Sequence, residues 1–234
     1  MQLEELFRRL SFGELSNLSI GSEGSGSIPE ESHGKVIQYA NEALLRIYSR
    51  FLLKSKDLII EQVRHITNYQ LHKQFAESSG SDVKWPYIKD LPDEPFTEDV
   101  IKILAVFDGD GCKLPLNDRE NKNSLFTPQP DVLQVPTPKA GIPLGVEYQA
   151  RHPVLNTEDK YLSQELEVPF YLEGALQSFV AHKVFSHMGG GDNLVKSQEH
   201  EAAYEKICLE VLDKDLGNTT AHTSHSKLEL RGFV

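Results

Sequence analysis

The chain has 234 residues, of which 39% are hydrophobic and 25% are charged, and its formal net charge is −11. This length can bury one sizeable core, or one core and a subdomain, and no apolar run reaches the roughly 20 residues that a membrane-spanning helix needs. The acidic balance argues against nucleic-acid binding by counterion release, because that mode of binding requires a basic patch.

Two helices are predicted near the N-terminus. Residues 3–15 carry Leu and Phe side chains at helical spacing on one face. A stretch rich in Gly and Ser follows, which is typical of a flexible loop. Pro29 then favours the start of a long helix, expected from Glu30 to Leu53. Its apolar residues form a wide stripe at helical spacing: Val36, Ile37, Ala40, Ala43, Leu44, Ile47, Tyr48, Phe51 and Leu52.

The middle of the chain changes to patterns typical of extended structure. A short helical turn is expected at Glu98–Lys102. Ile103–Phe107 and Cys112–Leu116 flank the sequence Asp108-Gly-Asp-Gly111, which predicts a β-hairpin with a tight turn. Further strands are expected at Leu58–Val63, Tyr69–Phe75, Val132–Val135 and Gly145–Ala150.

Two more helices are predicted toward the C-terminus. The first begins near Val168, with Pro169 in its first turn, and ends at Met188. Gly189-Gly-Gly191 interrupts the pattern, and a last helix follows from about Asn193 to Leu216. The short connection predicts that these two helices form a helical hairpin.

The sequence therefore predicts an α+β protein. Its N-terminal helices and C-terminal helical hairpin form an antiparallel helical bundle, which carries a β-rich insertion and an extended C-terminal arm. The expected divisions are the N-terminal helices of the bundle (1–55), a Pro/Gly-rich β insertion (56–166), the helical hairpin (167–217) and the arm (218–234). The expected bundle core is Leu44, Ile47, Tyr48, Phe51, Leu176, Phe179, Val180, Ile207 and Val211.

The arm carries the strongest binding signal in the sequence. Lys227-Leu-Glu-Leu-Arg231 alternates polar and apolar residues, which is the period of a β-strand, and two apolar residues follow. A strand without a partner in its own chain can pair with a sheet edge of another subunit, whereas the alternative is a disordered terminus. The residues expected to bind a partner are Leu228, Leu230, Arg231, Phe233 and Val234.

No metal or cofactor site is predicted. A calcium loop that began at Asp108 would need Gly at its sixth position and Glu at its twelfth, where Lys113 and Arg119 stand. His182 and His187 are five residues apart, which does not place them together on one helix face. The histidines lack the spacing of a zinc site.

Catalytic residues are not expected either. Glu165, Glu167 and Glu173 cluster at the predicted start of a helix, and paired carboxylates can hydrolyse glycosides. Acidic residues are nevertheless common at helix N-termini because the helix dipole favours them there. We therefore expect a protein that is not an enzyme.

Three segments together resemble one family of proteins. They are Tyr39–Tyr48, which contains Asn41-Glu-Ala43, the helix segment Val168–His187, and the acid-rich helix segment Glu199–Cys208. In this layout the chain resembles the head–tail connector, or adaptor, proteins of tailed bacteriophages, and among them the tail tubular protein A of podophages. The likeness covers most of the chain as an architecture.

The resemblance implies a structural role in the virion. Connector proteins form a ring, usually of twelve copies, between the portal protein and the tail tube or nozzle protein. The bundle would form the ring body, the β-rich segment would face the tail or a neighbouring copy, and the arm would dock on the portal. DNA would pass through the lumen without specific binding.

The sequence also leads to an expected location of the protein and to two alternative functions. The expected location is the head–tail junction of the virion, after assembly in the host cytoplasm, because the N-terminal segment Met1–Leu10 lacks the features of an export signal and no membrane contact is expected. The alternatives are another structural protein of a phage tail or baseplate, or a hydrolase of cell-wall glycan that acts through glutamates near Glu165.

Overall fold

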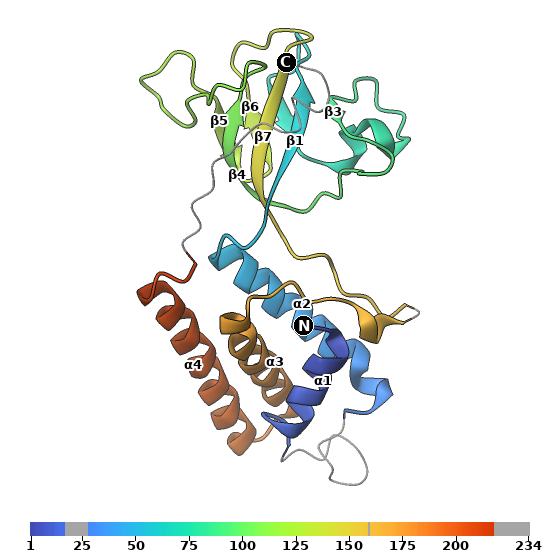
Figure 1. Cartoon of the computed structure of the whole chain (residues 1–234), viewed down its shortest axis with the longest axis vertical. Helices are drawn as coiled ribbons and strands as arrows, with labels where there is room; N and C mark the ends of the chain where they lie inside the picture. Colours follow the sequence, from blue (N-terminus) through green and yellow to red (C-terminus); the bar gives the residue numbers. More distant parts are fainter. Residues whose placement is uncertain (17–27, 159, 218–234) are drawn as a thin grey trace. The chain divides into compact units, whose positions relative to one another are not determined.

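The computed structural model describes residues 1–16, 28–158 and 160–217 (Figure 1). It is a mixed α and β structure, 40% helix and 21% strand, with four α-helices and two antiparallel sheets in the described residues. The chain divides into two compact units. Of the described residues, unit 1 contains Met1–Leu53 and the segment from His152 to Gly217, and unit 2 contains Lys54–Arg151.

Unit 1 holds all the α-helices of the described chain. Two short 3₁₀ turns, η3 (Tyr161–Ser163) and η4 (Phe170–Leu172), lie in the segment that leads into its second half. The helices are α1 (Leu3–Phe12), α2 (Glu30–Arg50), α3 (Glu173–Met188) and α4 (Gly191–Asp213).

Helix α3 occupies the centre of unit 1. It contacts α1, α2 and α4, and Figure 1 shows it between α2 and α4. Because it is surrounded, α3 is apolar around most of its circumference rather than along one stripe. Gly174 permits a close approach to α4, since a Cβ at this position would lie 3.4 Å from Cδ1 of Ile207. The buried residues of α3 are Ala175, Leu176, Ser178, Phe179, Val180, Ala181 and Phe185.

Eight of the nine residues expected in the core are buried: Leu44, Ile47, Tyr48, Phe51, Leu176, Phe179, Val180 and Val211. Ile207 is only partly buried, because it lies at the edge of the contact between α3 and α4. On the polar side of the helices, Arg50 donates to Glu205 at 2.6 Å, which links α2 to α4.

A glycine turn joins α3 to α4, as the sequence predicts. Gly189 and Gly190 have φ angles of 67° and 87°, a region that residues with a Cβ adopt at a cost. The Asn193 side chain donates to the carbonyl of Gly189 at 2.8 Å, which satisfies a group at the end of α3. The glycines therefore serve the short connection between α3 and α4.

The segment 152–166 belongs to unit 1, although the sequence analysis assigned it to the insertion. The Asn41 side chain forms two hydrogen bonds of 2.9 Å with the backbone of Leu155, one in each direction. The Leu166 N–H donates to the carbonyl of Met1 at 2.7 Å, and the Tyr48 hydroxyl donates to the carbonyl of Glu167 at 2.5 Å. Hydrogen bonds between such distant residues leave no periodic pattern in the sequence, so this attachment could not be predicted from it.

Unit 2 contains a four-stranded sheet in the order β3-β1-β7-β4 and a three-stranded sheet in the order β2-β6-β5. Its core includes four fully or nearly fully buried residues from both sheets: Ile60, Tyr69, Leu133 and Val146. The strands are β1 (Ser55–Glu61), β2 (Asn68–Gln70), β3 (Ile88–Lys89), β4 (Val100–Phe107), β5 (Phe126–Gln129), β6 (Val132–Gln134) and β7 (Pro143–Ala150).

The prediction of a helical turn at Glu98–Lys102 is wrong. Glu98 has a φ of 57°, and β4 begins at Val100. Asp99 explains the difference, because its buried carboxylate accepts from the Tyr148 hydroxyl at 3.0 Å and pairs with Lys56 at 2.5 Å. These bonds fasten the segment to β7 and β1 in place of a helical turn.

Three strand predictions need smaller corrections. The strand expected at Tyr69–Phe75 ends at Gln70, and Lys73–Phe75 forms a 3₁₀ turn. The second arm of the hairpin, at Cys112–Leu116, makes only isolated bridges, such as Phe107 with Lys113. Strand β5 was not predicted, because Pro128 interrupts its pattern.

Truncation of a central α3 side chain should destabilise unit 1. Leu176→Ala removes a fully buried side chain, so we expect the free energy of unfolding to fall by about 2–5 kcal/mol in urea denaturation. Leu45→Ala on α2 is the control, because Leu45 is 50% exposed and its loss should change stability by only about 0.5 kcal/mol. Equal losses for the two variants would contradict the described core.

Alkaline pH should destabilise unit 1 through two buried tyrosines. Burial, the larger cause, raises the pKa of Tyr48 and of Tyr204 from 10.0 to about 12. Above pH 10 the unfolded chain therefore loses these protons while the folded chain keeps them. Stability is full below pH 10 and falls toward about pH 12, by at most about 1.4 kcal/mol per pH unit for each tyrosine.

Tyr204→Phe tests this account. The Tyr204 hydroxyl lies beside the Cys208 thiol, and no oxygen or nitrogen of the described residues bonds it. Urea denaturation at pH 8 should show little change in the variant, whereas at pH 11 the variant should lose less stability than the parent chain. An identical alkaline loss in both chains would exclude the contribution of Tyr204.

Candidate functional site

The residues that the sequence predicts to bind a partner lie outside the described residues. Leu228, Leu230, Arg231, Phe233 and Val234 all follow Gly217, the last described residue. Gly217 itself packs against the end of α2, since a Cβ there would lie 3.4 Å from Cδ1 of Phe51. The last described residue therefore lies beside the end of α2.

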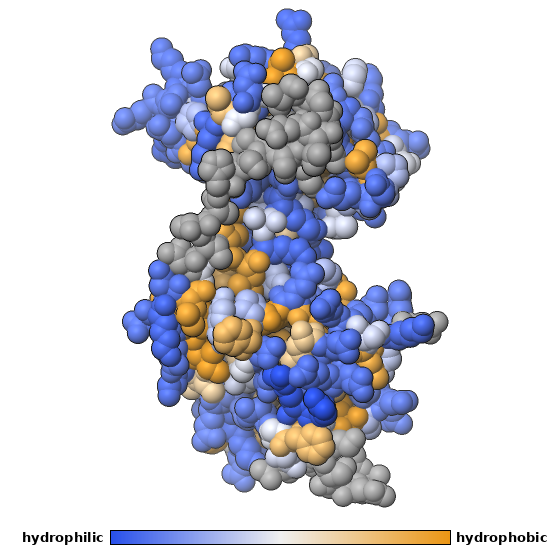
Figure 2. Space-filling model, in the orientation of Figure 1, coloured by the Kyte–Doolittle hydropathy of each residue, from blue (hydrophilic) through white to orange (hydrophobic). Residues whose placement is uncertain are grey.

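Helix α4 and the turn that follows it expose an apolar surface that we call the α4 patch: Val195, Ala202, Leu209, Leu212 and Leu216. Val195, Ala202 and Leu209 recur at intervals of seven, which keeps them on one side of α4, and Leu216 follows the end of the helix at Asp213. The patch is separate from the side of α4 that faces α3, where Tyr204, Cys208 and Val211 are buried. Figure 2 shows hydrophobic atoms gathered over the C-terminal half of α4.

The sequence analysis did not predict the α4 patch, because Tyr204, Cys208 and Val211 already supply one apolar face of the helix. Leu212, which follows Val211 directly, is 51% exposed. The interval of seven residues from Val195 to Leu209 was the available signal for a second face.

The surroundings of the patch fit contact with another macromolecule. Its centre is a shallow depression lined by Ala202, Glu205, Lys206, Leu209, Glu210, Leu212 and Asp213. The neighbouring turn η4 contacts α4 and contains Phe170, a residue that is 83% exposed. An apolar centre with a charged border is the usual composition of a protein–protein interface.

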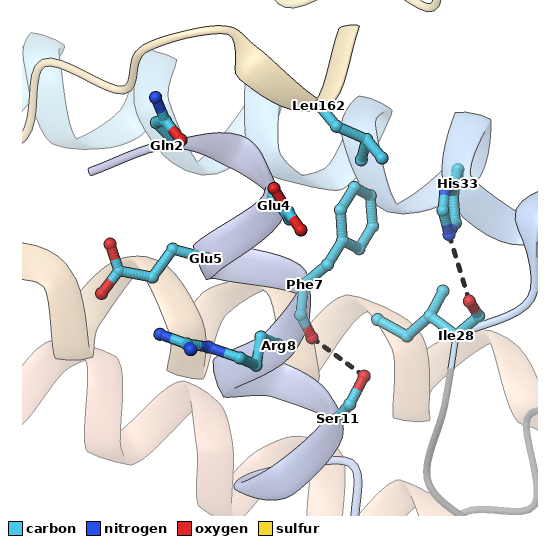
Figure 3. Close-up of a pocket in the computed structure, with 9 residues that line it drawn as sticks. All are labelled: Gln2, Glu4, Glu5, Phe7, Arg8, Ser11, Ile28, His33 and Leu162. Carbon is cyan, nitrogen blue, oxygen red and sulfur yellow. Dashed lines mark hydrogen bonds between the residues drawn. The ribbon is translucent and has the colours of Figure 1, made fainter. Parts of the chain in front are cut away.

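A second concave surface lies at α1, the start of α2 and η3 (Figure 3). This α1 pocket has a cavity volume of about 540 Å³. His33 helps to build it, because its ring stacks on Phe7 at 4.5 Å and bonds the Tyr161 hydroxyl at 2.8 Å and the carbonyl of Ile28 at 3.1 Å. The lining residues are Gln2, Glu4, Glu5, Phe7, Arg8, Ser11, Ile28, His33 and Leu162.

The glutamates considered for glycan hydrolysis have structural surroundings. Glu173 accepts from Arg9 at 2.6 Å, and Arg9 also donates to Glu5 at 2.6 Å. The hydrogen bond with Glu5, followed by that with Glu173, raises the pKa of Arg9. Glu165 forms an isolated bridge with Gln2. Glu173 therefore serves to attach α1 to α3.

The histidines of unit 1 are used for packing and hydrogen bonding. The ring of His182 bonds the Ser197 carbonyl at 3.0 Å, which joins α3 to α4. His187 stacks on Tyr39, and His200 stacks on Phe185 and lies 3.2 Å from Glu14. The described residues contain no group of three or more potential ligands that could hold a metal ion.

The turn at Asp108–Gly111 is held by backbone hydrogen bonds. The Asp108 carboxylate accepts from the N–H of Asp110 at 3.1 Å and from the N–H of Cys112 at 2.7 Å. The Asp108 N–H in turn donates to the carbonyl of Cys112 at 3.0 Å. These bonds support the prediction of a hairpin turn in preference to a calcium loop.

No protein-family model matches the chain, and no curated protein matches its sequence. Among the residues that the structure describes, no helix is both long and apolar enough to cross a membrane. Function must therefore be inferred from the surfaces of the molecule and from its sequence.

Substitution of Asp108 can separate a turn from a calcium loop. Asp108→Ala should lower the free energy of unfolding by about 1 kcal/mol because two backbone N–H groups lose their acceptor, whereas Asp108→Asn keeps an acceptor and should be tolerated. Asp110→Ala is the control, since the Asp110 side chain is exposed. A rise in the melting temperature of the parent chain on addition of calcium would contradict this account.

Proposed function

We propose that this chain is a structural protein of a tailed bacteriophage virion, which joins the portal to the tail as a ring around the DNA channel. The observation that carries the proposal is the α4 patch. A helix that buries one apolar face in its own unit and exposes a second is suited to contact with other chains, and exposed apolar patches mark such contacts.

The surroundings of the residues considered for catalysis and for calcium binding also favour an assembly role. Glu173 is bound to Arg9, and Asp108 is bound to its own turn, so each has a structural use. An acidic chain suits a channel through which DNA passes, because like charge opposes adhesion of the polymer to the wall. The resemblance of Tyr39–Tyr48, Val168–His187 and Glu199–Cys208 to head–tail connectors gives the place of assembly.

The proposal assigns a separate role to unit 1, to unit 2 and to the arm. The helices of unit 1 form an antiparallel bundle that makes the body of a ring, usually of twelve copies in connectors. Unit 2 faces the tail tube or nozzle protein or a neighbouring copy. The arm, through Leu228, Leu230, Arg231, Phe233 and Val234, pairs with an edge of the portal.

Removal of the arm should abolish or strongly weaken portal binding. A chain that ends at Gly217 retains every described contact of unit 1, so we expect it to fold and to bind the portal ring at least roughly tenfold more weakly. Binding can be measured by surface plasmon resonance on immobilised portal rings.

Point variants keep this test informative. Leu228→Asp and Phe233→Ala alter apolar residues of the arm and should reproduce the loss, whereas Glu229→Ser alters a polar position between two leucines and should have little effect. Unchanged affinity of the truncated chain would refute the role of the arm.

A further inference from the structure

We infer that the C-terminal arm (218–234) docks on the α4 patch of its own chain, and that the portal exposes the patch when it binds the arm. The arm lies outside the described residues, which end at Gly217. The docking goes beyond the proposed function and does not need it, whereas the release of the arm by the portal rests on the proposed function.

The arm is attached directly after the α4 patch. Leu216 belongs to the patch, and the arm follows Gly217. The helical part of the patch, from Val195 to Leu212, is roughly 25 Å long at 1.5 Å per residue. The chain from Gly217 to Leu228 can span up to about 36 Å, since an extended chain covers about 3.3 Å per residue. The apolar end of the arm can therefore reach every part of the patch.

This attachment favours the arm over any separate molecule as the occupant of the patch. Segments joined by short linkers reach effective concentrations on the order of 1 mM at a neighbouring site. A second copy in solution at about 1 μM would need to bind the patch roughly a thousand times more tightly in order to compete. The covalent link therefore selects the arm of the same chain, even where the contact itself is weak.

The arm and the patch have matching apolar surfaces. The alternation of the arm sequence places Leu228 and Leu230 on one side of an extended segment, and Phe233 follows. In the patch, Leu209 and Leu212 are 57% and 51% exposed. Contact between the two sets of leucines removes both surfaces from water, and this removal is the main favourable contribution to association.

Charge disfavours a second α4 helix as the occupant and accepts the arm. Helix α4 contains six acidic residues and two lysines, so two such helices in contact would oppose like charges. The arm carries Lys227 and Arg231 against one acidic residue, Glu229. Lys and Arg side chains can lie along an apolar surface while their charged ends reach acidic groups at its border.

One acidic group at the border of the patch is available for such a contact. The charged residues that line the depression in the patch are Glu205, Lys206, Glu210 and Asp213. Arg50 already binds Glu205 at 2.6 Å, and Lys214 lies 3.7 Å from Glu210. Asp213 is exposed and forms no ion pair with any described residue. Because an exposed ion pair adds little to affinity, the charges orient the arm and the apolar contact holds it.

Docking of the arm makes the exposure of the patch depend on the portal. Leu228 and Leu230 cannot lie on the patch and on an edge of the portal at the same time, so the two contacts exclude each other. The free chain keeps its patch covered and stays a single copy. On the portal the arm leaves, and the patch becomes available to the neighbouring copies of the ring.

Pulsed EPR on the full chain measures whether the arm lies on the patch. One nitroxide label is attached at Ser226→Cys in the arm, and a second at Glu199→Cys, an exposed position of α4. Cys112→Ser removes the exposed native thiol, while Cys208 is buried. A docked arm gives a narrow distribution of distances between the two labels, whereas an undocked arm gives a broad distribution.

Two arm variants complete the test. Leu228→Asp should convert the narrow distribution into a broad one, because it places a charge on the apolar side of the arm. Glu229→Ser is the matched control, since it alters the polar side, and it should leave the distribution narrow. A broad distribution in the labelled chain without either change would overturn the docking.

A mixture of two chains that each carry one label tests docking between copies. This mixture should give no defined distance, because each arm stays on its own chain. A defined distance between the labels would show that the arm of one copy lies on the patch of another, which would contradict the inference.

Addition of portal rings separates this inference from the proposed function. Doubly labelled chains, diluted with unlabelled chains, should bind the rings and shift to longer distances. If the chains bind but the distribution is broad before binding, the connector role stands and the docking is wrong. If the chains bind and the narrow distribution persists, the release is wrong. If the distribution is narrow and the rings do not bind the chain, the docking stands and the connector role fails.

Discussion

The structure of unit 1 depends on the burial of α3. This helix begins beside the Glu173–Arg9 ion pair, passes between α2 and α4, and ends in a glycine turn. Because α3 is surrounded, each of the other helices needs only one apolar face toward it. Helix α4 is the exception, since it presents a second apolar face to solvent, and that exception links the fold to the proposed assembly.

The sequence predicted the structure correctly where the periodicity of apolar residues and the positions of turn-forming residues determine it. The stripe of α2, the glycine turn between α3 and α4, and the tight turn at Asp108 follow from local spacing and backbone conformation. The prediction failed where the structure depends on single hydrogen bonds between residues that are far apart in the sequence. Asp99 converts an expected helical turn into the start of β4, and Asn41 attaches a segment that the sequence assigned to the insertion.

Of the two candidate surfaces, one could also have been predicted from the sequence and the other could not. The interval of seven residues along α4 is visible in the sequence, but it was hidden by the stronger pattern of the buried face. The α1 pocket could not be predicted, because it combines Phe7, His33 and Leu162 from three separate elements. Such a site becomes evident only when the packing of α1 against α2 and η3 is known.

The central claim is that this chain assembles on a portal ring. Native mass spectrometry of the full chain, alone and mixed with portal rings of the same virion, tests it most directly. The account predicts that the portal mass increases by a whole number of copies that matches the symmetry of the portal ring. Separate masses for the portal and for the chain at high concentration would contradict the connector function.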